Sequence, residues 1–326
     1  MYDSLVFLVL PLQNIIGLVL NLIVLILICN LAEGALQYVK TCLFISTVHS
    51  ILYCGMNHLL IPTHHITREG YFLTLHGEFL ALLSHDIINI LLLAWSFLHS
   101  LTWTLQPFNF IVQYLVIAKK GSVTTRTFCF LLFLSFCLSI PYFLLCLLIF
   151  PCETDAQLIS QIFARSYTSD DLPFVSSSFV YGKPFENRKH WHYLLIWFSF
   201  GGSFGISYSI VLFYVRKLVR ITGKDLLKDR KESLRVHTRV VRWLILQSVA
   251  PFTPLFFMSS LAVVSLSLNL HLSSFSILIS LLSAFSPIVQ GAVNVVQIAR
   301  WNCSNLDLSH QRSRRNTITQ STTITF

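Results

Sequence analysis

The chain has 326 residues, of which 54% are hydrophobic and only 11% are charged. A soluble domain carries roughly 25% charged residues, so this chain could not cover a globule with a polar surface. The composition excludes an ordinary soluble protein and predicts an integral membrane protein. Most of the eight cysteines fall within apolar stretches, which indicates small buried side chains and not a disulfide framework.

Seven stretches are apolar over about the 20 residues that a helix needs to cross the hydrocarbon core of a bilayer. We therefore predict an all-α, seven-helix membrane bundle over residues 1–300, with spans at 5–31, 40–62, 86–115, 127–150, 192–217, 241–266 and 274–299. A Ser/Thr-rich cytoplasmic tail is expected at 301–326. The first stretch has no basic residue before it and is longer than the hydrophobic region of a signal peptide, so we expect it to stay in the membrane.

The loops differ in their basic residues, and this difference predicts the orientation. Of the 23 Lys and Arg residues, 18 lie in the segments that follow the first, third, fifth and seventh spans, all on one side of the membrane. The other five lie in the loops on the opposite side. Because cytoplasmic loops are enriched in Lys and Arg, we expect the N-terminus outside and the C-terminus in the cytoplasm. The net charge of +9 is then a signal of topology, and no nucleic-acid partner is needed to explain it. Residues 71–80 become an extracellular segment.

Polar residues inside a membrane span are candidates for function, because burying them in lipid is costly. At mid or inner depth, several are expected to form hydrogen bonds between helices: Asn21, Gln106, Asn109, Gln247 and Asn294. Toward the outer ends of the third and fifth spans, others are expected to face a ligand cavity: Asp86, Asn89, Trp95, His99, Tyr193 and Trp197. Such a cavity suits a small, largely apolar ligand. For Tyr193, an interfacial aromatic belt is the alternative.

The histidines and the cysteine expected outside the membrane are candidates for metal ligands and for a disulfide. No Cys/His spacing or carboxylate motif accompanies the histidines, so we expect exposed loop residues and no metal at His64, His65, His190 and His192. Cys152 lies in a polar extracellular loop, where it could pair with Cys54 or Cys146.

The sixth span contains two prolines, Pro251 and Pro254, in its outer half. In lipid, neighbouring helices can re-satisfy the carbonyl groups that proline leaves without a partner. Two interpretations stay open: a static bend that shapes packing, or a hinge that couples an extracellular cavity to the cytoplasmic side.

Basic residues share a helix face on both sides of the third inner loop. Spacings of three and four residues align Arg216 and Arg220 with Lys217 on one side, and Arg235, Arg239 and Arg242 on the other. A partner helix with an acidic end would fit between these faces, whereas contact with lipid headgroups is the alternative. In the fifth span, Gly201 and Gly205 permit close helix approach, by internal packing or by dimerisation.

These features together resemble the nematode serpentine seven-transmembrane chemoreceptor superfamily, most closely its Str-type group with Srd- and Srh-like relatives. Gly17 and Asn21 are similar to the Gly-x-x-x-Asn of the first span in that family. Leu244, Gln247 and Pro251 are similar to its Leu-x-x-Gln-x-x-x-Pro in the sixth. Two positions depart from the pattern. Gln113–Tyr114 stand where the family has Arg-Tyr, and "QIARW" at 297–301 stands where it usually has Tyr-Arg.

The resemblance implies a G-protein-coupled chemosensory receptor in the plasma membrane of sensory-neuron cilia. It would bind a small environmental molecule such as an odorant and signal to a heterotrimeric G protein. Gln113 and Tyr114 would then face the G protein together with the arginines of the third inner loop. Membrane lipid is a further partner, and a homo- or hetero-dimer is open.

Other classes were weighed against the receptor. A Walker loop, a nucleophile elbow and a dinucleotide fingerprint are all missing from the sequence, so we expect no enzyme and no cofactor. One alternative is a seven-helix ligand-gated channel, whose opposite orientation the basic loops disfavour. The other is a transporter, which would need internal repeats and intramembrane charges.

Overall fold

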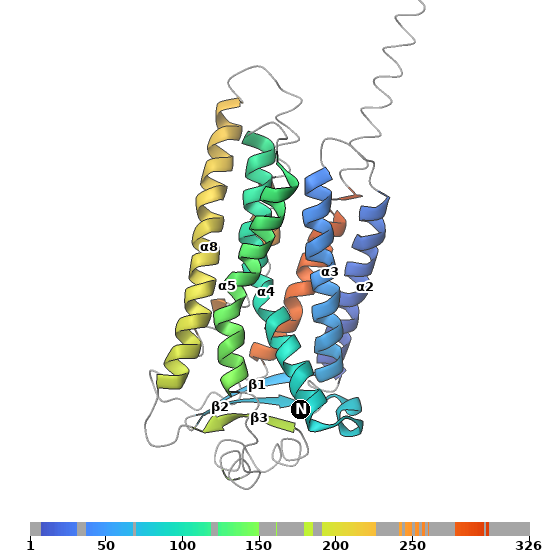
Figure 1. Ribbon diagram of the computed structural model, residues 1–326. Coiled ribbons are helices and arrows are strands. Elements are labelled where there is room, and N and C mark those ends of the chain that lie inside the picture. Colours follow the sequence, from blue (N-terminus) through green and yellow to red (C-terminus); the bar gives the residue numbers. More distant parts are fainter. Residues whose placement is uncertain are drawn as a thin grey trace, which may run out of the picture.

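The computed structural model describes residues 8–30, 37–67, 70–118, 123–149, 161, 179–184, 191–225, 241–242, 245–249, 252–253, 256–257, 260, 278–296 and 298–299. Its longest elements are helices that stand side by side in one bundle (Figure 1). They are α2 (Leu10–Cys29), α3 (Gln37–Leu60), α4 (His85–Ala118), α5 (Thr125–Ile149) and α8 (Trp191–Asp225). A further helical stretch, at 278–296, packs against α2.

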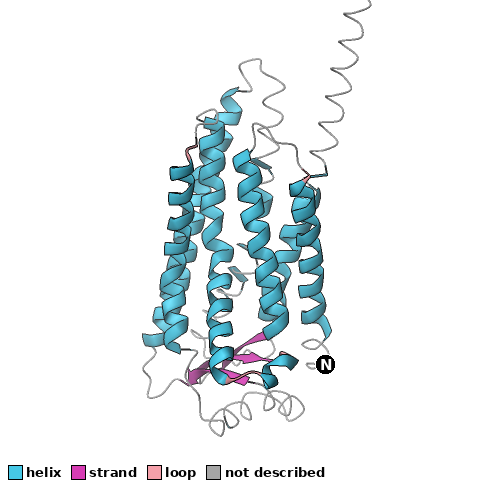
Figure 2. Cartoon of the chain, turned by 45° about the vertical axis from the view of Figure 1, so that its right-hand side comes forward, coloured by secondary structure: helices cyan, strands magenta, loops and turns pink. Residues whose placement is uncertain are grey.

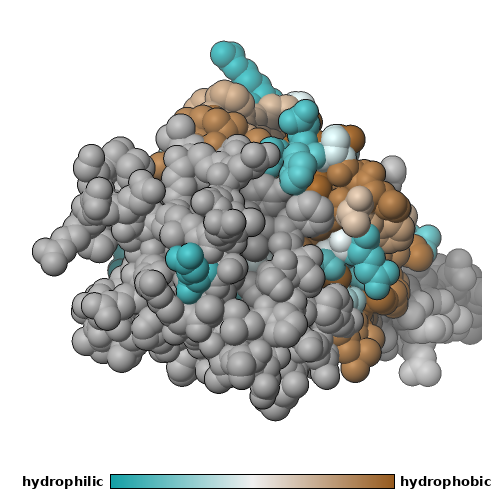
Figure 3. Space-filling view, turned by 90° about the horizontal axis from the view of Figure 1, so that it is seen from below, coloured by the Kyte–Doolittle hydropathy of each residue, from teal (hydrophilic) through white to brown (hydrophobic). Residues whose placement is uncertain are grey.

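Five helices within these ranges are long and apolar enough to cross a membrane: Leu10–Cys29, Lys40–Leu60, His85–Val116, Thr125–Leu147 and Leu278–Val296. In α2, buried residues recur every three or four positions and include Asn14, Gly17 and Asn21. Large apolar side chains such as Leu12 and Ile26 point outward, with 52% and 61% of their surface exposed. This arrangement, polar groups inside and apolar groups outside, is the one that lipid favours. In Figure 3, where residues of uncertain placement are grey, most of the coloured residues on the side of the bundle are hydrophobic (brown).

A small antiparallel sheet lies across one end of the bundle (Figure 2). Its order is β1 (Pro62–Thr67), β2 (Gly70–Leu75), β3 (Phe179–Pro184). Strand β1 follows α3 within two residues, and β2 leads through the short 3-10 helix η2 (Glu78–Leu82) into α4. The predicted extracellular segment at 71–80 thus contains a strand, because Phe72, Leu73 and Leu75 are buried while their backbone pairs with β1 and β3.

Hydrogen bonds between helices occur at two of the predicted polar positions. Asn21 Nδ2 donates to Pro287 O at 3.1 Å and joins α2 to the stretch 278–296. Asn109 Nδ2 donates to Ser46 Oγ at 3.0 Å and joins α4 to α3. Gln106 differs from the prediction, since its Nε2 donates to Thr102 O of its own helix at 3.3 Å. The side chains of Gln247 and Asn294 are buried.

Glycine brings α2 and the stretch 278–296 close together. A Cβ atom at Gly291 would lie 3.0 Å from Leu20 Cβ, and one at Gly17 would lie 3.5 Å from Ile288 Cγ1 as well as 2.9 Å from Cys54 Sγ of α3. The stretch of α8 around Gly201 and Gly205 is different, because a Cβ atom there would meet nothing within 4 Å. The favoured prediction of internal packing at these two glycines is therefore wrong, since both are exposed on the outside of the bundle.

Charged side chains separate between the two ends of the bundle. The lysines and arginines described on α3, α5 and α8 lie near the helix ends opposite the sheet (Figure 1): Lys40, Arg126, Arg216, Lys217 and Arg220. The acidic residues Glu78 and Asp86 lie at the sheet end, and both are exposed. Among the side chains that the structure describes, the basic ones thus lie opposite the sheet and these two acidic ones beside it.

Candidate functional site

Aromatic and imidazole rings gather in the half of the bundle nearest the sheet. Trp95, His99 and Trp103 follow one another at intervals of four residues, so they share one face of α4. Their rings are in contact: Trp95 and His99 are stacked with centroids 5.2 Å apart, and His99 meets Trp103 edge-on at 5.3 Å. Helix α3 adds Tyr53 and helix α5 adds Tyr142, 5.7 Å from His99 and 5.5 Å from Trp103 respectively.

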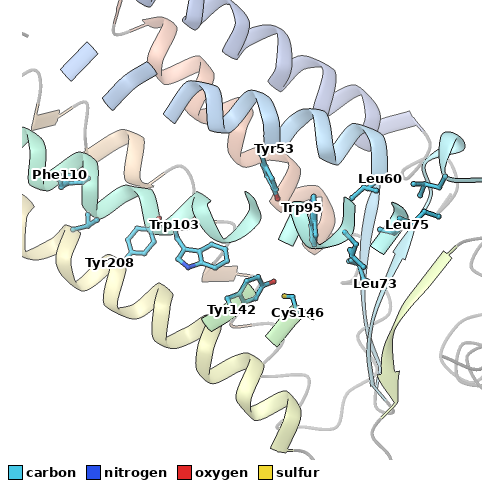
Figure 4. Close-up of a cluster of buried hydrophobic side chains, with 14 of the residues drawn as sticks. Tyr53, Leu60, Leu73, Leu75, Trp95, Trp103, Phe110, Tyr142, Cys146 and Tyr208 are labelled. Atoms are coloured by element: carbon cyan, nitrogen blue, oxygen red, sulfur yellow. The ribbon is translucent and has the colours of Figure 1, made fainter. Parts of the chain in front are cut away.

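These five residues, together with His64 of β1, form what we call the aromatic cluster. The His64 ring lies 5.9 Å from Trp95 and therefore joins the sheet to the bundle. All six side chains are buried. Figure 4 shows Tyr53, Trp95, Trp103 and Tyr142 directed toward one region from three helices, with Leu73 and Leu75 of β2 beside Trp95.

Polar atoms within the cluster are mostly engaged by neighbouring side chains. Tyr53 Oη is 2.8 Å from His99 Nδ1, and Trp95 Nε1 donates to Asn57 Oδ1 at 2.6 Å. Trp103 Nε1 donates to Ser203 Oγ of α8 at 3.2 Å. Among the described residues, the second ring nitrogen of His99, Nε2, has no hydrogen-bond partner, although it is buried. The cluster thus combines several buried aromatic rings with one ring nitrogen that no described residue engages.

The sheet, which lies across the end of the bundle next to this cluster, holds a second, polar set of residues. Thr63, His65, Thr74 and His76 form this set, which we call the lid network. His76 Nε2 lies 2.7 Å from Thr63 Oγ1 and 2.8 Å from Thr74 Oγ1, while His65 Nε2 lies 2.7 Å from Thr74 Oγ1. The two threonine hydroxyls, which face each other across β1 and β2, are also hydrogen bonded.

Burial sets the protonation state of these histidines. It lowers the pKa of His64 to about 4 and that of His76 to about 3, and it lowers the pKa of His65 well below the ordinary value. The prediction that His64 and His65 are exposed loop residues is therefore wrong. Neighbouring strand residues point to opposite faces, so His64 contacts the aromatic cluster while His65 joins the lid network. His190 and the side chain of His192 lie outside the described residues.

The structure brings only some of the predicted ligand-facing residues together. Trp95 and His99 lie in the aromatic cluster, whereas Asn89 is half-buried and Asp86 is exposed in the first turn of α4. Tyr193 and Trp197 belong to α8, but their side chains lie outside the described part. Sequence analysis missed four members: Tyr53, His64, Trp103 and Tyr142. For Trp103 the four-residue spacing from His99 was an available signal; the others depend on contacts between distant segments.

The candidates for contact with a G protein lie at the opposite end of the bundle. Gln113 is buried, and the Tyr114 ring packs edge-on against Tyr214 of α8 at 5.1 Å. Lys217 Nζ lies 5.4 Å from the centre of the Tyr114 ring. Exposed arginines flank this contact: Arg216, Arg220 and Arg242. Arg235, Arg239, Pro251 and Pro254 lie outside the described residues.

Neither a metal site nor a disulfide is found in the described part of the chain. There, no group of three or more His, Cys, Asp or Glu side chains is placed to hold a metal ion. Cys54 and Cys146 are both buried, free thiols. The bond to Cys152 that the sequence left open is thus not formed at either position, and Cys152 itself lies outside the described residues.

Five helices of membrane length, with buried polar and aromatic side chains between them, define a helical membrane protein as the class. The chain belongs to the family described as "Serpentine type 7TM GPCR chemoreceptor Str", whose model matches residues 8–301. Both the Str-type resemblance and the predicted all-α, seven-helix membrane fold are thereby confirmed. Among solved structures, squid rhodopsin is similar over 91% of this chain and 81% of its own, with 12% identity and a TM-score of 0.48. None of the curated proteins compared with the chain matches it.

Proposed function

We propose that the chain binds a small environmental molecule in the outer half of its helix bundle and signals through its basic inner loops to a heterotrimeric G protein. The observation that carries this proposal is the aromatic cluster. It takes residues from α3, α4, α5 and β1, so a molecule bound there touches several elements at once. Aromatic walls with few polar groups are typical of sites for small, largely apolar ligands.

The separation of charge supports the proposed orientation. Cytoplasmic ends of membrane proteins are enriched in Lys and Arg, and the basic ends of α3, α5 and α8 lie opposite the sheet. The sheet and the aromatic cluster are then extracellular, with the N-terminus outside and the C-terminus inside. We place the receptor in the plasma membrane, in the cilia of sensory neurons.

The inner end supplies the proposed G-protein contact. Helices α4 and α8 meet there through Tyr114 and Tyr214, and exposed arginines of α8 surround the contact. A shift between the two helices would change which of these groups a partner meets. Gln113, in place of the arginine usual in the family, would leave this surface without one charge. We further propose that Pro251 and Pro254 act as the hinge that links the two ends.

Lipid and a second receptor are the remaining proposed partners. Phe198 and Leu212 of α8 expose 80% and 59% of their surface, as expected for side chains in contact with lipid. The open face at Gly201 and Gly205 would let another helix approach closely, as in a homo- or hetero-dimer.

The test is activation of a G-protein reporter in cells that display the chain at their surface, with a panel of volatile and water-soluble odorants. We expect at least one odorant to activate the reporter. Replacing both hinge prolines (Pro251→Ala with Pro254→Ala) should abolish the response without loss of surface display. Pro141→Ala serves as the matched control, because Pro141 is an exposed helix proline in α5.

Other outcomes separate the alternatives. A response that survives the double substitution would show that the two prolines form a static bend and not a hinge. A ligand-induced current without reporter activation would instead indicate a ligand-gated channel. Activation only in Gln113→Arg would show that ligand binding persists while coupling depends on the missing charge.

A further inference from the structure

We infer that the ligand of the aromatic cluster is uncharged and that His99 anchors it through a single carbonyl or hydroxyl oxygen. This inference rests on the proposed function, because it takes the cluster as the ligand site. It adds the chemical class of the ligand and the residue that selects for it.

The first argument is the type of polar residue buried in the bundle. Among the described residues, buried polar side chains are all Asn, Gln, Ser, Thr or His, and none is Asp, Glu, Lys or Arg. A charged ligand without a counter-ion loses its hydration and gains no compensating partner in a low-dielectric interior. An ammonium or carboxylate ligand would therefore be disfavoured beside these rings.

Two ionisable residues on α4 and β1 do not change this conclusion. Asp86 precedes Trp95 by nine residues, which is roughly 14 Å along a helix axis, and its side chain is exposed. His64 is the cluster member that comes from the sheet. Because burial lowers its pKa to about 4, it is neutral at physiological pH and offers no positive charge to a carboxylate.

The second argument is the hydrogen bonding of His99. Its Nδ1 is engaged with Tyr53 Oη, whereas its Nε2 is buried and has no hydrogen-bond partner in the part of the chain that the structure describes. A neutral imidazole nitrogen donates or accepts according to the tautomer. It can therefore bind a carbonyl oxygen as donor or a hydroxyl group as acceptor.

The surroundings of His99 define the rest of the ligand. The ring is stacked on Trp95 and meets the edge of Trp103. The indole N–H groups of both tryptophans already donate to Asn57 and Ser203. Beyond the His99 nitrogen, these two side chains offer mainly aromatic surface, which suits a hydrocarbon chain or ring.

The experiment measures the thermal unfolding of the purified receptor with five probes that share a seven-carbon skeleton: heptan-2-one, heptan-2-ol, heptane, heptylamine and heptanoate. At neutral pH the amine and the acid are charged. We expect the ketone and the alcohol to raise the unfolding temperature more than heptane, and the two charged probes to leave it unchanged. Unequal effects of the ketone and the alcohol would identify the preferred oxygen group.

Two substitutions test the anchoring residue. His99→Phe retains an aromatic ring but removes both ring nitrogens, the Nδ1 that bonds to Tyr53 Oη and the Nε2 proposed to bind the ligand. The ligand itself loses only its bond to Nε2, so the affinity for the ketone should fall about tenfold, the loss expected for one hydrogen bond. His49→Phe is the matched control, since His49 is a buried histidine whose Nε2 already bonds to Leu98 O at 2.8 Å. It should lower stability without changing the preference for the ketone over heptane.

The inference is overturned if a charged probe stabilises the receptor as much as the ketone does, or if none of the five probes stabilises it. It is also overturned if His99→Phe keeps the preference for the ketone over heptane. These failures differ from failure of the proposed function. Neutral probes that bind as expected without activating a G protein would leave the inference intact, whereas activation by charged ligands alone would support the receptor and not the inference.

Discussion

At the scale of single residues, the buried amide of Asn21 connects two helices that are far apart in the sequence. It donates to Gly17 O of its own helix at 2.8 Å and to Pro287 O at 3.1 Å. The Asn21 side chain is completely buried. Removing a buried hydrogen-bonded group costs about 1–3 kcal/mol, because its partners lose a bond that no water replaces.

We therefore expect Asn21→Ala to lower the free energy of unfolding by about 2 kcal/mol. Thermal unfolding of the purified protein would measure the change. Asn30→Ala is the control, because Asn30 ends the same helix with an exposed side chain. Its effect should stay within about 0.5 kcal/mol. Equal losses in the two variants would show that the bond to Pro287 contributes nothing.

At the scale of elements, the packing of α2 against the stretch 278–296 depends on glycine, which has no side chain to keep the two helices apart. A Cβ atom at Gly291 would lie 3.0 Å from Leu20 Cβ and 3.1 Å from Asn21 Nδ2. Leu20 Cβ is attached directly to the α2 backbone, so relieving the contact requires the helices to separate.

Gly291→Ala should therefore destabilise the bundle by about 1–3 kcal/mol, the usual cost of overpacking a core. Gly55→Ala offers a matched comparison, since a Cβ atom there would meet nothing within 4 Å. That substitution should be neutral or stabilise α3 by up to about 1 kcal/mol, because alanine favours helix more than glycine does. A loss of stability at both sites would contradict the packing argument.

The lid network makes the sheet sensitive to acid. In the folded state the pKa of His76 is about 3, below its ordinary value of 6.5, because burial disfavours the charged imidazolium. Between these two values the unfolded state binds more protons than the folded state. Stability is therefore fully present above pH 6.5 and falls as the pH decreases toward 3, by at most about 1.4 kcal/mol per pH unit for each histidine.

Thermal unfolding measured from neutral pH to pH 4 would follow this loss. We expect His76→Gln to flatten the dependence on pH, whereas His58→Gln, at an exposed position of α3, should leave it unchanged. An unaltered slope in His76→Gln would show that the lid network does not cause the sensitivity.

An element can be predicted from the sequence when the contacts that specify it join residues close together in the chain, and not when they join distant segments. Helices such as α2 and α5 are locally encoded, since about 20 apolar residues suffice to specify a membrane helix. The sheet was missed because β2 lies between β1 and β3, and β3 follows more than one hundred residues later. Trp95 and His99 could be predicted as buried polar or aromatic residues of one helix. Their neighbours Tyr53 and Tyr142 could not, because helix packing alone brings them together.

At the scale of the whole molecule, the two ends of the bundle differ in charge. Basic side chains gather at the ends of α3, α5 and α8 opposite the sheet, and the acidic Glu78 and Asp86 lie beside the sheet. Cytoplasmic loops retain Lys and Arg during insertion, so this distribution should fix one orientation.

An epitope tag at the N-terminus should accordingly bind antibody on intact cells, and a tag at the C-terminus only after permeabilisation. Labelling measured by flow cytometry would decide between the two orientations. An N-terminal tag that is protected until permeabilisation would contradict the receptor topology and favour the channel.

The sheet that covers one end of the bundle also affects the route by which a molecule would reach the aromatic cluster. Thr63, His64 and Phe72 are at most 1% exposed, so the sheet covers its end of the bundle. If this cover stays in place, entry occurs sideways between helices, from the bilayer, and the receptor samples the concentration dissolved in lipid. Each methylene group favours transfer from water by about 0.8 kcal/mol, so sensitivity within a homologous series would rise roughly fourfold per carbon. Membrane partitioning, and not solubility in water, would then set the detection threshold.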